Sequence, residues 1–232
     1  MDPKRLPKAE QALYHRLNKE YTTTFEPLRL KNDLCLNLLK VADLEKLLDG
    51  QDPLKDVSKF PFWVKLWESA IVLADFLANQ DYKPGCTVLE LGAGLGACGM
   101  AAAARGCDTV LSDYQEHILD FQRVSAAASG LHNVSFELLD WLNPPEMKPF
   151  DVVVGAEIIF NEQFNEPLLN VLRKSVKPDG VIYLTHDIKR KSLPEFLKLA
   201  EKEYEISASK RRLRSLEEDK YVLMNRLIPR KS

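Results

Sequence analysis

The residues with the clearest potential for chemistry lie in the segment VLELGAGLGACG, where an apolar strand ends and glycines follow at alternate positions. Gly92 and Gly94 let the backbone turn sharply against a ligand, and a helix N-terminus then faces that ligand. Gly92, Gly94 and Ala97 also satisfy the dinucleotide fingerprint, so the motif alone indicates a nucleotide-like cofactor without specifying it. A purely structural tight turn is the other interpretation.

Three features favour S-adenosylmethionine over a nicotinamide dinucleotide. Glu90 lies two residues before Gly92, where its carboxylate can meet the loop or a cationic cofactor from beneath but would repel a pyrophosphate. A helix and about 85 residues precede this first core strand, whereas a dinucleotide domain usually opens with that strand. The sheet is also expected to end in an antiparallel hairpin.

Acidic and aromatic residues at the ends of the next two strands extend the predicted cofactor site. Asp113 follows Gly92 by 21 positions, where its carboxylate can accept both ribose hydroxyls, and capping of the next helix is the alternative. The Asp140 carboxylate can accept from the adenine amino group while the Trp141 indole covers the ring face. Alternatively, Trp141 packs under the loop 143–145.

Alternating strands and helices must position these residues. Nearly continuous apolar strands predict a parallel sheet buried on both faces, which is a doubly wound α/β domain of seven strands. The expected strands are 87–91, 109–113, 134–140, 150–155 and 180–186, with helices at 66–80, 115–128, 166–177 and 193–202. Pro178–Gly180 predicts a turn. The segments 203–210 and 220–228, joined by a charged loop, predict an antiparallel hairpin on the sheet edge.

Residues 1–60 are expected to form an N-terminal accessory cap, and residues 61–232 the α/β domain. Residues 1–20 have the pattern of a polar helix, and YTTTFEPLRL that of a short strand or extended arm. The breaker-rich GQDPLKD predicts a boundary near residues 50–56. A monomer is the default expectation.

Composition excludes several classes of protein. With 45% hydrophobic and 28% charged residues, the chain has the make-up of a soluble globular domain. Its 34 acidic and 32 basic side chains give a charge of −2, so no overall positive field gathers phosphate backbones, which disfavours nucleic acid as the main partner. No stretch approaches roughly 18 uninterrupted apolar residues and no secretory signal opens the chain, which favours a cytoplasmic protein without a membrane partner.

The cysteines and histidines suggest no metal site. Four isolated cysteines without a CxxC pair are expected to be reduced thiols, and no His or Cys cluster has metal-ligand spacing. His117 and His132 are expected at the surface. The basic runs 189–191 and 210–212 are interpreted as solvated loops, with an acidic partner surface as the alternative.

Several motifs together carry a family resemblance. They are FWVKLWESAIVLADFL, VLELGAGLGACGMAAAARG, LSDY, LLDW and DVVVGAEIIF. Over roughly residues 25–228, the chain resembles the class I (seven-stranded) methyltransferases, and in particular the lysine methyltransferases of family 16. The resemblance implies S-adenosylmethionine as methyl donor, S-adenosylhomocysteine as product and a protein lysine as acceptor. It also implies that Trp67, at the head of the helix before the first strand, lies against the methionine part of the cofactor.

In that family an acidic residue, two others and an aromatic residue follow the fourth strand, and Glu157 and Phe160 match those positions. Members usually carry Asp there, so the Glu is a departure. By resemblance, Glu157 attracts and orients a lysine ammonium, and Phe160 excludes water and favours loss of its proton. Capping of a helix near Glu162 is the alternative for Glu157. His186 and Asp187 lie on the same carboxyl edge and are further candidates for the acceptor pocket.

Other functions remain compatible with the same cofactor site. Methylation of a small molecule or a nucleic acid would use the same cofactor site with different acceptor-binding residues around it. A non-catalytic module that binds S-adenosylmethionine and a partner would need no turnover. An NAD-linked oxidoreductase would have no affinity for S-adenosylhomocysteine.

Overall fold

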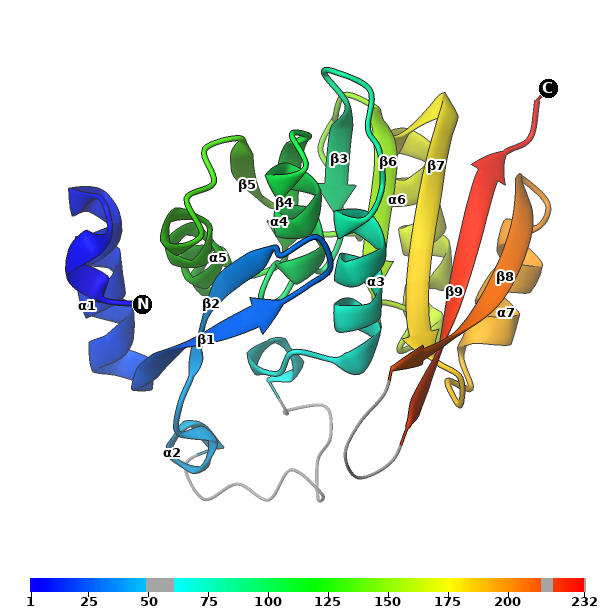
Figure 1. Ribbon diagram of the computed structural model, residues 1–232. Coiled ribbons are helices and arrows are strands. Elements are labelled where there is room, and N and C mark those ends of the chain that lie inside the picture. The colour runs from blue at the N-terminus through cyan, green and yellow to red at the C-terminus, as the bar shows by residue number, and fades with distance from the viewer. Residues whose placement is uncertain (49–60, 214–218, 232) are drawn as a thin grey trace.

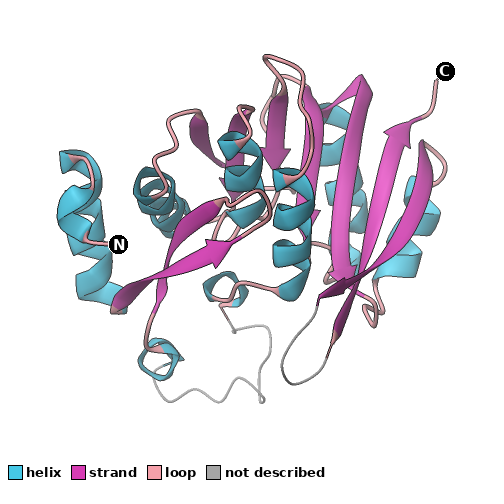
Figure 2. Ribbon diagram, viewed as in Figure 1, coloured by secondary structure: helices cyan, strands magenta, loops and turns pink. Residues whose placement is uncertain are grey.

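The computed structural model describes residues 1–48, 61–213 and 219–231 of the chain. In these ranges a seven-stranded sheet is covered by helices on both faces, and a separate two-stranded sheet lies against one flank (Figure 1 and Figure 2). The predicted boundary near residues 50–56 lies outside the described residues.

The central sheet has the strand order β5-β4-β3-β6-β7-β9-β8. Its strands are β3 (Thr87–Glu90), β4 (Asp108–Asp113), β5 (Val134–Leu138), β6 (Phe150–Ala156), β7 (Val176–Asp187), β8 (Tyr204–Leu213) and β9 (Lys220–Pro229). The first five pair in parallel, and β9 pairs antiparallel with both β7 and β8. The predicted doubly wound, mostly parallel sheet with an antiparallel C-terminal hairpin is confirmed.

Two apolar cores hold the helices on the sheet. The helices are α3 (Glu68–Ala78), α4 (Ala97–Ala104), α5 (Glu116–Ala128), α6 (Asn165–Ser175) and α7 (Leu193–Ala200). One core includes Leu73, Leu77 and Met100 from α3 and α4, and the other includes Leu168 and Phe196 from α6 and α7. The carboxyl ends of the parallel strands point toward the lower edge of Figure 1, where ligands bind in open sheets of this kind.

Two parts of the strand prediction were wrong. The expected turn at Pro178–Gly180 lies within β7, at a shift in its pairing register with β6. A Cβ at Gly180 would lie 2.8 Å from Val176 Cγ2 and 3.0 Å from the Asp151 carbonyl oxygen. The breaker residues therefore form a bulge packed against β6. The basic run 210–212, expected in a loop, lies in β8 because its backbone continues the pairing with β9.

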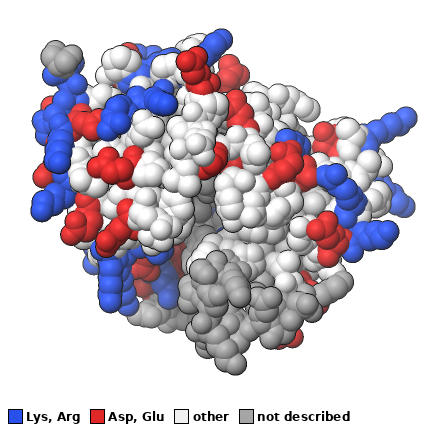
Figure 3. Space-filling model, turned by 180° about the vertical axis from the view of Figure 1, so that it is seen from behind, with Lys and Arg blue, Asp and Glu red and all other residues white. Residues whose placement is uncertain are grey.

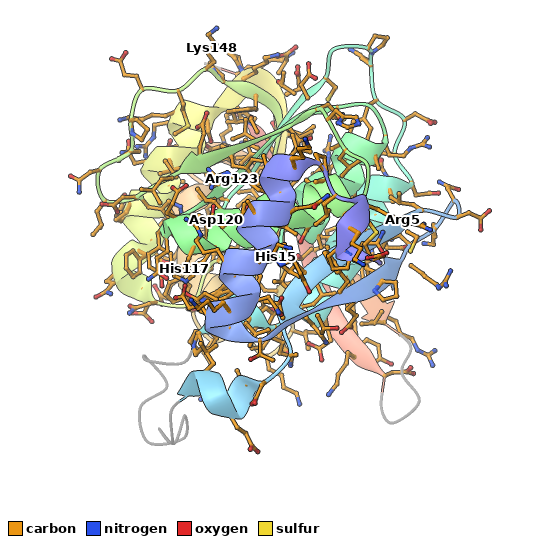
Figure 4. All side chains as sticks on the ribbon, turned by 90° about the vertical axis from the view of Figure 1, so that its left-hand side faces the viewer. Arg5, His15, His117, Asp120, Arg123 and Lys148 are labelled. Carbon is orange, nitrogen blue, oxygen red and sulfur yellow. The ribbon has the colours of Figure 1, made fainter. Side chains whose placement is uncertain are left out.

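Residues 1–48, which we name the N-terminal arm, pack onto α5. The arm contains η1 (Pro3–Arg5), α1 (Lys8–Tyr21), β1 (Thr23–Arg29), β2 (Cys35–Val41) and α2 (Leu44–Leu48), so the helix and strand expected there are confirmed. Arg16 forms an ion pair with Asp120 of α5. Asp120 also pairs with Arg123 of the same helix (Figure 4). The Leu39 backbone N–H donates to Ser125 Oγ at 2.8 Å. After the arm, the described chain resumes at residue 61 and forms η3 (Phe62–Val64).

Candidate cofactor and acceptor site

The glycine-rich segment 92–96, named here the cofactor loop, joins β3 to α4. Gly92, Gly94 and Gly96 have φ angles of 56°, 52° and 75°, a left-handed conformation that glycine adopts without steric cost. A Cβ at Gly92 would also lie 3.0 Å from Ile158 Cγ2, so a side chain there would disturb the end of β6. The loop therefore requires glycine for its backbone conformation and for its close neighbours.

Glu90 lies beneath this loop and holds the start of α4. Its Oε2 accepts a hydrogen bond from Gly99 N at 2.7 Å, and the residue is only 2% exposed. Burial raises the pKa of the Glu90 carboxyl to about 7. The structure thus places the carboxylate against the first turn of α4, directly after the loop, while its contact with residues 92–96 or with a cationic cofactor stays a prediction.

Asp113 links the end of β4 to the cofactor loop. Its Oδ2 accepts from Gly94 N and its Oδ1 from Tyr114 N, both at 2.8 Å, and burial raises the pKa of the carboxyl to about 6. Helix α5 begins three residues later, at Glu116, with Gln115 as its N-cap, so the hydrogen bonds of Asp113 hold the loop rather than cap that helix. Tyr114, 65% exposed beside it, was not singled out from the sequence, although LSDY places an aromatic residue directly after the acid.

A short cover lies over the cofactor loop, formed by residues 61–67. The Trp63 carbonyl oxygen and Cα would lie 3.6 and 3.7 Å from a Cβ at Gly94. Trp67 is the N-cap of α3, as its position in the sequence suggested, and its Nε1 donates to the Phe62 carbonyl oxygen at 2.9 Å. The backbone of the cover thus lies against the loop, and the hydrogen bond from the Trp67 indole links the two ends of the cover.

Aromatic rings fasten the cover to the N-terminal arm and to α5. The Trp63 ring centroid lies 4.9 Å from Phe121, 5.2 Å from His117 and 6.0 Å from Tyr21. Tyr21 also stacks on His117 at 6.0 Å. His117, expected at the surface, is partly buried where the arm docks (Figure 4), and this burial lowers the pKa of its imidazole. This cluster was missed, although Trp63 lies in the motif FWVKLW.

The segment after β5 contributes a second wall to the loop. The Trp141 ring atom Cζ2 would lie 3.6 Å from a Cβ at Gly92. The Asp140 carboxylate accepts from Leu142 N at 2.9 Å and from Asn143 Nδ2 at 3.0 Å, and these bonds lower its pKa. The structure therefore brings the Trp141 indole to the cofactor loop, while the Asp140 side chain closes its own turn.

Glu157 lies just past β6 in an unusual and well-held conformation. Its φ is 58°, which residues other than glycine rarely adopt. Glu157 Oε1 accepts from Asp187 N at 2.6 Å, and Oε2 accepts from Arg190 Nε at 3.1 Å and also from Arg190 Nη2. The basic residue Arg190, expected in a solvated loop, is instead an ion-pair partner of the acidic residue of the motif.

The alternative role of Glu157 as a helix cap does not fit the structure. The short helix η4 (Glu162–Phe164) is capped by Asn161, whose side chain accepts from Gln163 N at 3.1 Å. Glu157 instead accepts hydrogen bonds from Asp187 at the end of β7 and from Arg190 in the loop that follows.

A groove of about 680 Å³ opens beside the Glu157–Arg190 pair, and we name it the acceptor groove. Phe160 forms part of its wall, is 55% exposed, and lies 5.5 Å from the Phe164 ring. Charged residues of both signs line the rest: Glu162, Asp187, Lys189, Arg190 and Lys191. Figure 3 shows the molecule from behind, with Lys and Arg mainly toward its flanks and upper edge. The hollow near the centre of that view is surrounded by uncharged side chains and is therefore not identified with the charged groove.

His186 supports this groove without lining it. The residue is fully buried, its Nε2 accepts from Ile159 N at 3.2 Å, and its Nδ1 has no hydrogen-bond partner among the described residues. Burial lowers the pKa of the imidazole to about 3, so the ring is neutral near pH 7. Of these two candidates, which form the end of β7, Asp187 lines the groove and His186 does not.

Contacts at the carboxyl edge join the cofactor loop to the acceptor groove. Ile158, next to Glu157, is the residue whose Cγ2 approaches Gly92. Thr185 Oγ1 donates to the Ser69 carbonyl oxygen at 3.1 Å, which ties β7 to the start of α3 near Trp67. The residues predicted from separate motifs therefore gather at one edge of the sheet.

Neither a metal cluster nor a membrane span was found in the parts of the chain that are described. Residues 1–48, 61–213 and 219–231 contain no group of three His, Cys, Asp or Glu side chains suited to a metal ion. In the same ranges no helix is both long enough and apolar enough to cross a bilayer.

Known proteins resemble both the sequence and the fold. A family profile described as lysine methyltransferase matches residues 56–203. The chain is 30% identical over 171 residues to EEF1A lysine methyltransferase 3 of Mus musculus, covering 66% of this chain and 72% of that protein. It is also 30% identical over 146 residues to protein-lysine N-methyltransferase rrg1 of Schizosaccharomyces pombe, covering 56% of this chain but only 48% of that protein.

Solved structures share the fold at low sequence identity. Precorrin-6y C5,15-methyltransferase of Geobacter metallireducens superposes with a TM-score of 0.60 at 15% identity, over 72% of this chain and 91% of that one. This likeness concerns the fold alone, and the family assignment depends on the sequence comparisons.

Proposed function

The chain belongs to the lysine methyltransferase family, and we propose on that basis that it methylates the side-chain amine of lysine in a protein substrate. It is an S-adenosylmethionine-dependent methyltransferase with the class I fold. The observation that carries the choice of acceptor is the groove lined by Phe160 and Arg190. Arg190 pairs with Glu157, and the next residue, Ile158, lies close to Gly92 of the cofactor loop.

The residues around the loop fit S-adenosylmethionine. Three left-handed glycines leave the backbone bare beneath the cover, and a buried carboxylate and an indole flank them. In our proposal Asp113 and Trp141 hold the nucleoside half, while Trp67 holds the methionine half. Glu90 supports the loop from beneath, and Asp140 shapes the turn beside the adenine. When bound, the cofactor supplies a methyl group activated by a cationic sulfonium.

The acceptor side needs no nucleophile of its own, because the substrate amine provides the electron pair. The enzyme must hold that amine in line with the methyl group and keep it unprotonated. Phe160 provides an apolar wall that excludes water, and Glu157 provides a fixed hydrogen-bond acceptor for the amine. Among the described residues, Oε1 of Glu157 accepts a hydrogen bond from Asp187 N alone, which leaves acceptor capacity on that atom.

The compartment, the oligomeric state and the class of partner are proposed separately from the reaction. We propose a cytoplasmic monomer that recognises a protein, with nucleic acid disfavoured by the net charge of −2. Methylation of a small molecule and a non-catalytic partner module are the alternatives that the experiment must separate.

The test is transfer of labelled methyl from S-adenosylmethionine into soluble extract of the source cells, resolved by gel. The wild type is compared with Glu157→Ala and with Glu205→Ala, a control that removes an exposed carboxylate on β8. We expect a discrete protein band that is lost only with Glu157→Ala, while calorimetry shows that all three bind S-adenosylhomocysteine. Replacing the labelled lysine of the acceptor by arginine should abolish the label.

Two results would contradict the proposal. A label that survives the lysine replacement would identify another acceptor residue. No labelled protein, with intact binding of S-adenosylhomocysteine, would point to a small-molecule acceptor or to a partner module.

A further inference from the structure

The carboxylate proposed to receive the acceptor lysine already has a cation bound to it. Two Arg190 nitrogens donate to Glu157 Oε2, and the Glu157 side chain is only 11% exposed. A bare carboxylate in this position would attract a lysine as ammonium. The ion pair instead presents the acceptor with a fixed oxygen and almost no net charge.

The loop that carries Arg190 is held in place on both sides. Arg190 N donates to the Asp187 carbonyl oxygen at 3.0 Å, and Lys189 N donates to Asp187 Oδ1 at 2.7 Å. Ser192 Oγ donates to the Ile159 carbonyl oxygen at 2.6 Å, which anchors the loop to the residues after β6. The pairing of Arg190 with Glu157 is therefore part of an ordered turn.

The other charged groups around the groove offset one another. Lys189 and Lys191 line it from the loop after β7, while Asp187 lines it from the end of that strand and Glu162 from η4. His186, packed beneath, is neutral near pH 7. The charges of these two lysines and two carboxylates sum to zero. The net charge next to the acceptor amine therefore depends on whether Glu157 is neutralised by Arg190.

The reaction itself requires an uncharged amine. The nitrogen lone pair forms the new carbon–nitrogen bond as the carbon–sulfur bond breaks. The electron pair of the broken carbon–sulfur bond stays on sulfur, which gives S-adenosylhomocysteine. An ammonium has no such lone pair, so its proton must pass to water or buffer before transfer. Free lysine has a pKa of about 10.4, and an unpaired carboxylate within about 4–6 Å would raise it by about 1–3 units.

Resting on the proposed lysine methylation, we propose that Arg190 is a positioning residue that neutralises Glu157, so that the acceptor lysine binds as the free amine. Arg190 acts through Glu157 and does not itself touch the methyl group. Its removal should therefore change the protonation of the bound lysine, which loss of a structural contact alone would not do.

The experiment uses the full chain saturated with S-adenosylhomocysteine and a peptide that spans the lysine labelled in the extract assay. Calorimetry near pH 8, in two buffers of different ionisation heat, gives the number of protons released when the peptide binds. We expect about one proton for the wild type, because the lysine is charged when free and neutral when bound. Arg190→Gln should release clearly fewer, and Arg190→Lys, which keeps the charge, should resemble the wild type.

Turnover gives an independent readout. In Arg190→Gln the pH at half-maximal kcat should rise by about one unit or more, so activity falls about tenfold at neutral pH and recovers under alkaline conditions. Glu157→Gln, which leaves Arg190 unpaired, should move the profile in the opposite direction. The double variant, with no charge at either position, should return it to the wild-type position.

A matched control is available on another surface. Arg173 forms two hydrogen bonds of 2.7 Å with Glu203, so Arg173→Gln also removes the arginine of an arginine–glutamate pair. It should leave both the proton count and the profile unchanged. If the wild type methylates lysine but Arg190→Gln releases as many protons as the wild type, the proposed role of Arg190 is overturned and the proposed function is kept. Absence of lysine methylation in the wild type would overturn the proposed function together with this inference.

Discussion

Replacing Glu90 by glutamine should stabilise the protein by several kcal/mol under alkaline conditions and by less than about 1 kcal/mol near pH 5. Glu90 is buried, and burial raises its pKa from the usual value near 4.5 to about 7. The site therefore favours the neutral acid over the carboxylate. Glutamine resembles that neutral acid in shape and can still accept the hydrogen bond from Gly99 N.

The sign of the effect follows from proton binding. Because the pKa of Glu90 is higher in the folded state, the folded protein binds more protons than the unfolded chain between about pH 4.5 and 7. The contribution of Glu90 to the free energy of unfolding is complete below pH 4.5 and is lost as the pH rises through about 7. The difference between the two pKa values corresponds to about 3 kcal/mol, which is the gain expected for Glu90→Gln near pH 8.5.

The assay is chemical denaturation followed by circular dichroism between pH 5 and 9, without cofactor. Glu205→Gln makes the same substitution at an exposed position of β8, so the difference between the two variants isolates the effect of burial. An advantage of Glu90→Gln that stays constant across this range would show that Glu90 does not change protonation there. The electrostatic account of the site beneath the cofactor loop would then be wrong.

Three further substitutions test the packing around the cofactor. Gly94→Val places a branched side chain at a φ of 52° beneath Trp63, so affinity for S-adenosylhomocysteine should fall at least about tenfold by calorimetry; unchanged affinity would contradict our placement of the cofactor. Gly99→Ala would place a Cβ 2.2 Å from Leu111 Cδ2 and should lower the free energy of unfolding by about 1–3 kcal/mol in urea titrations, and an unchanged midpoint would mean that the core can adjust. Tyr21→Ala removes a ring 6.0 Å from Trp63 and should change the tryptophan fluorescence and weaken cofactor binding about threefold to tenfold, which is about 0.6–1.4 kcal/mol. A loss of stability with unchanged cofactor affinity would show that the arm does not influence the cover.

The sequence was sufficient for the sheet and for the cofactor loop because their signals are local. A strand, three glycines and a helix follow one another within the segment 87–104, and the later parallel strands end at the same edge of the sheet. Glu90 and Asp113 could be placed by counting from that strand. Their hydrogen bonds to Gly99 and Gly94 could not, since these depend on how the loop folds back.

The acceptor side was harder to predict because it is assembled from separate loops. The acidic residue of the motif was found, but its partner lies 33 positions away in a run that looked like a solvated loop. Only the turn after β7, with its bonds to Asp187 and Ile159, brings Arg190 to Glu157. The aromatic cluster around Trp63 was missed for the same reason, because Tyr21 and His117 meet only after the arm docks.

The docking of the N-terminal arm also has a consequence for the order of folding. Arg16 and Asp120 are 104 positions apart, so their contact closes a long loop and must await the synthesis of α5. Contacts of such high sequence separation form slowly compared with the local pairing of β1 with β2. Because the ring of Tyr21 in this arm packs against Trp63 of the cover, we expect the cover to become fixed late in folding. Acquisition of cofactor affinity during refolding should then lag behind formation of the sheet.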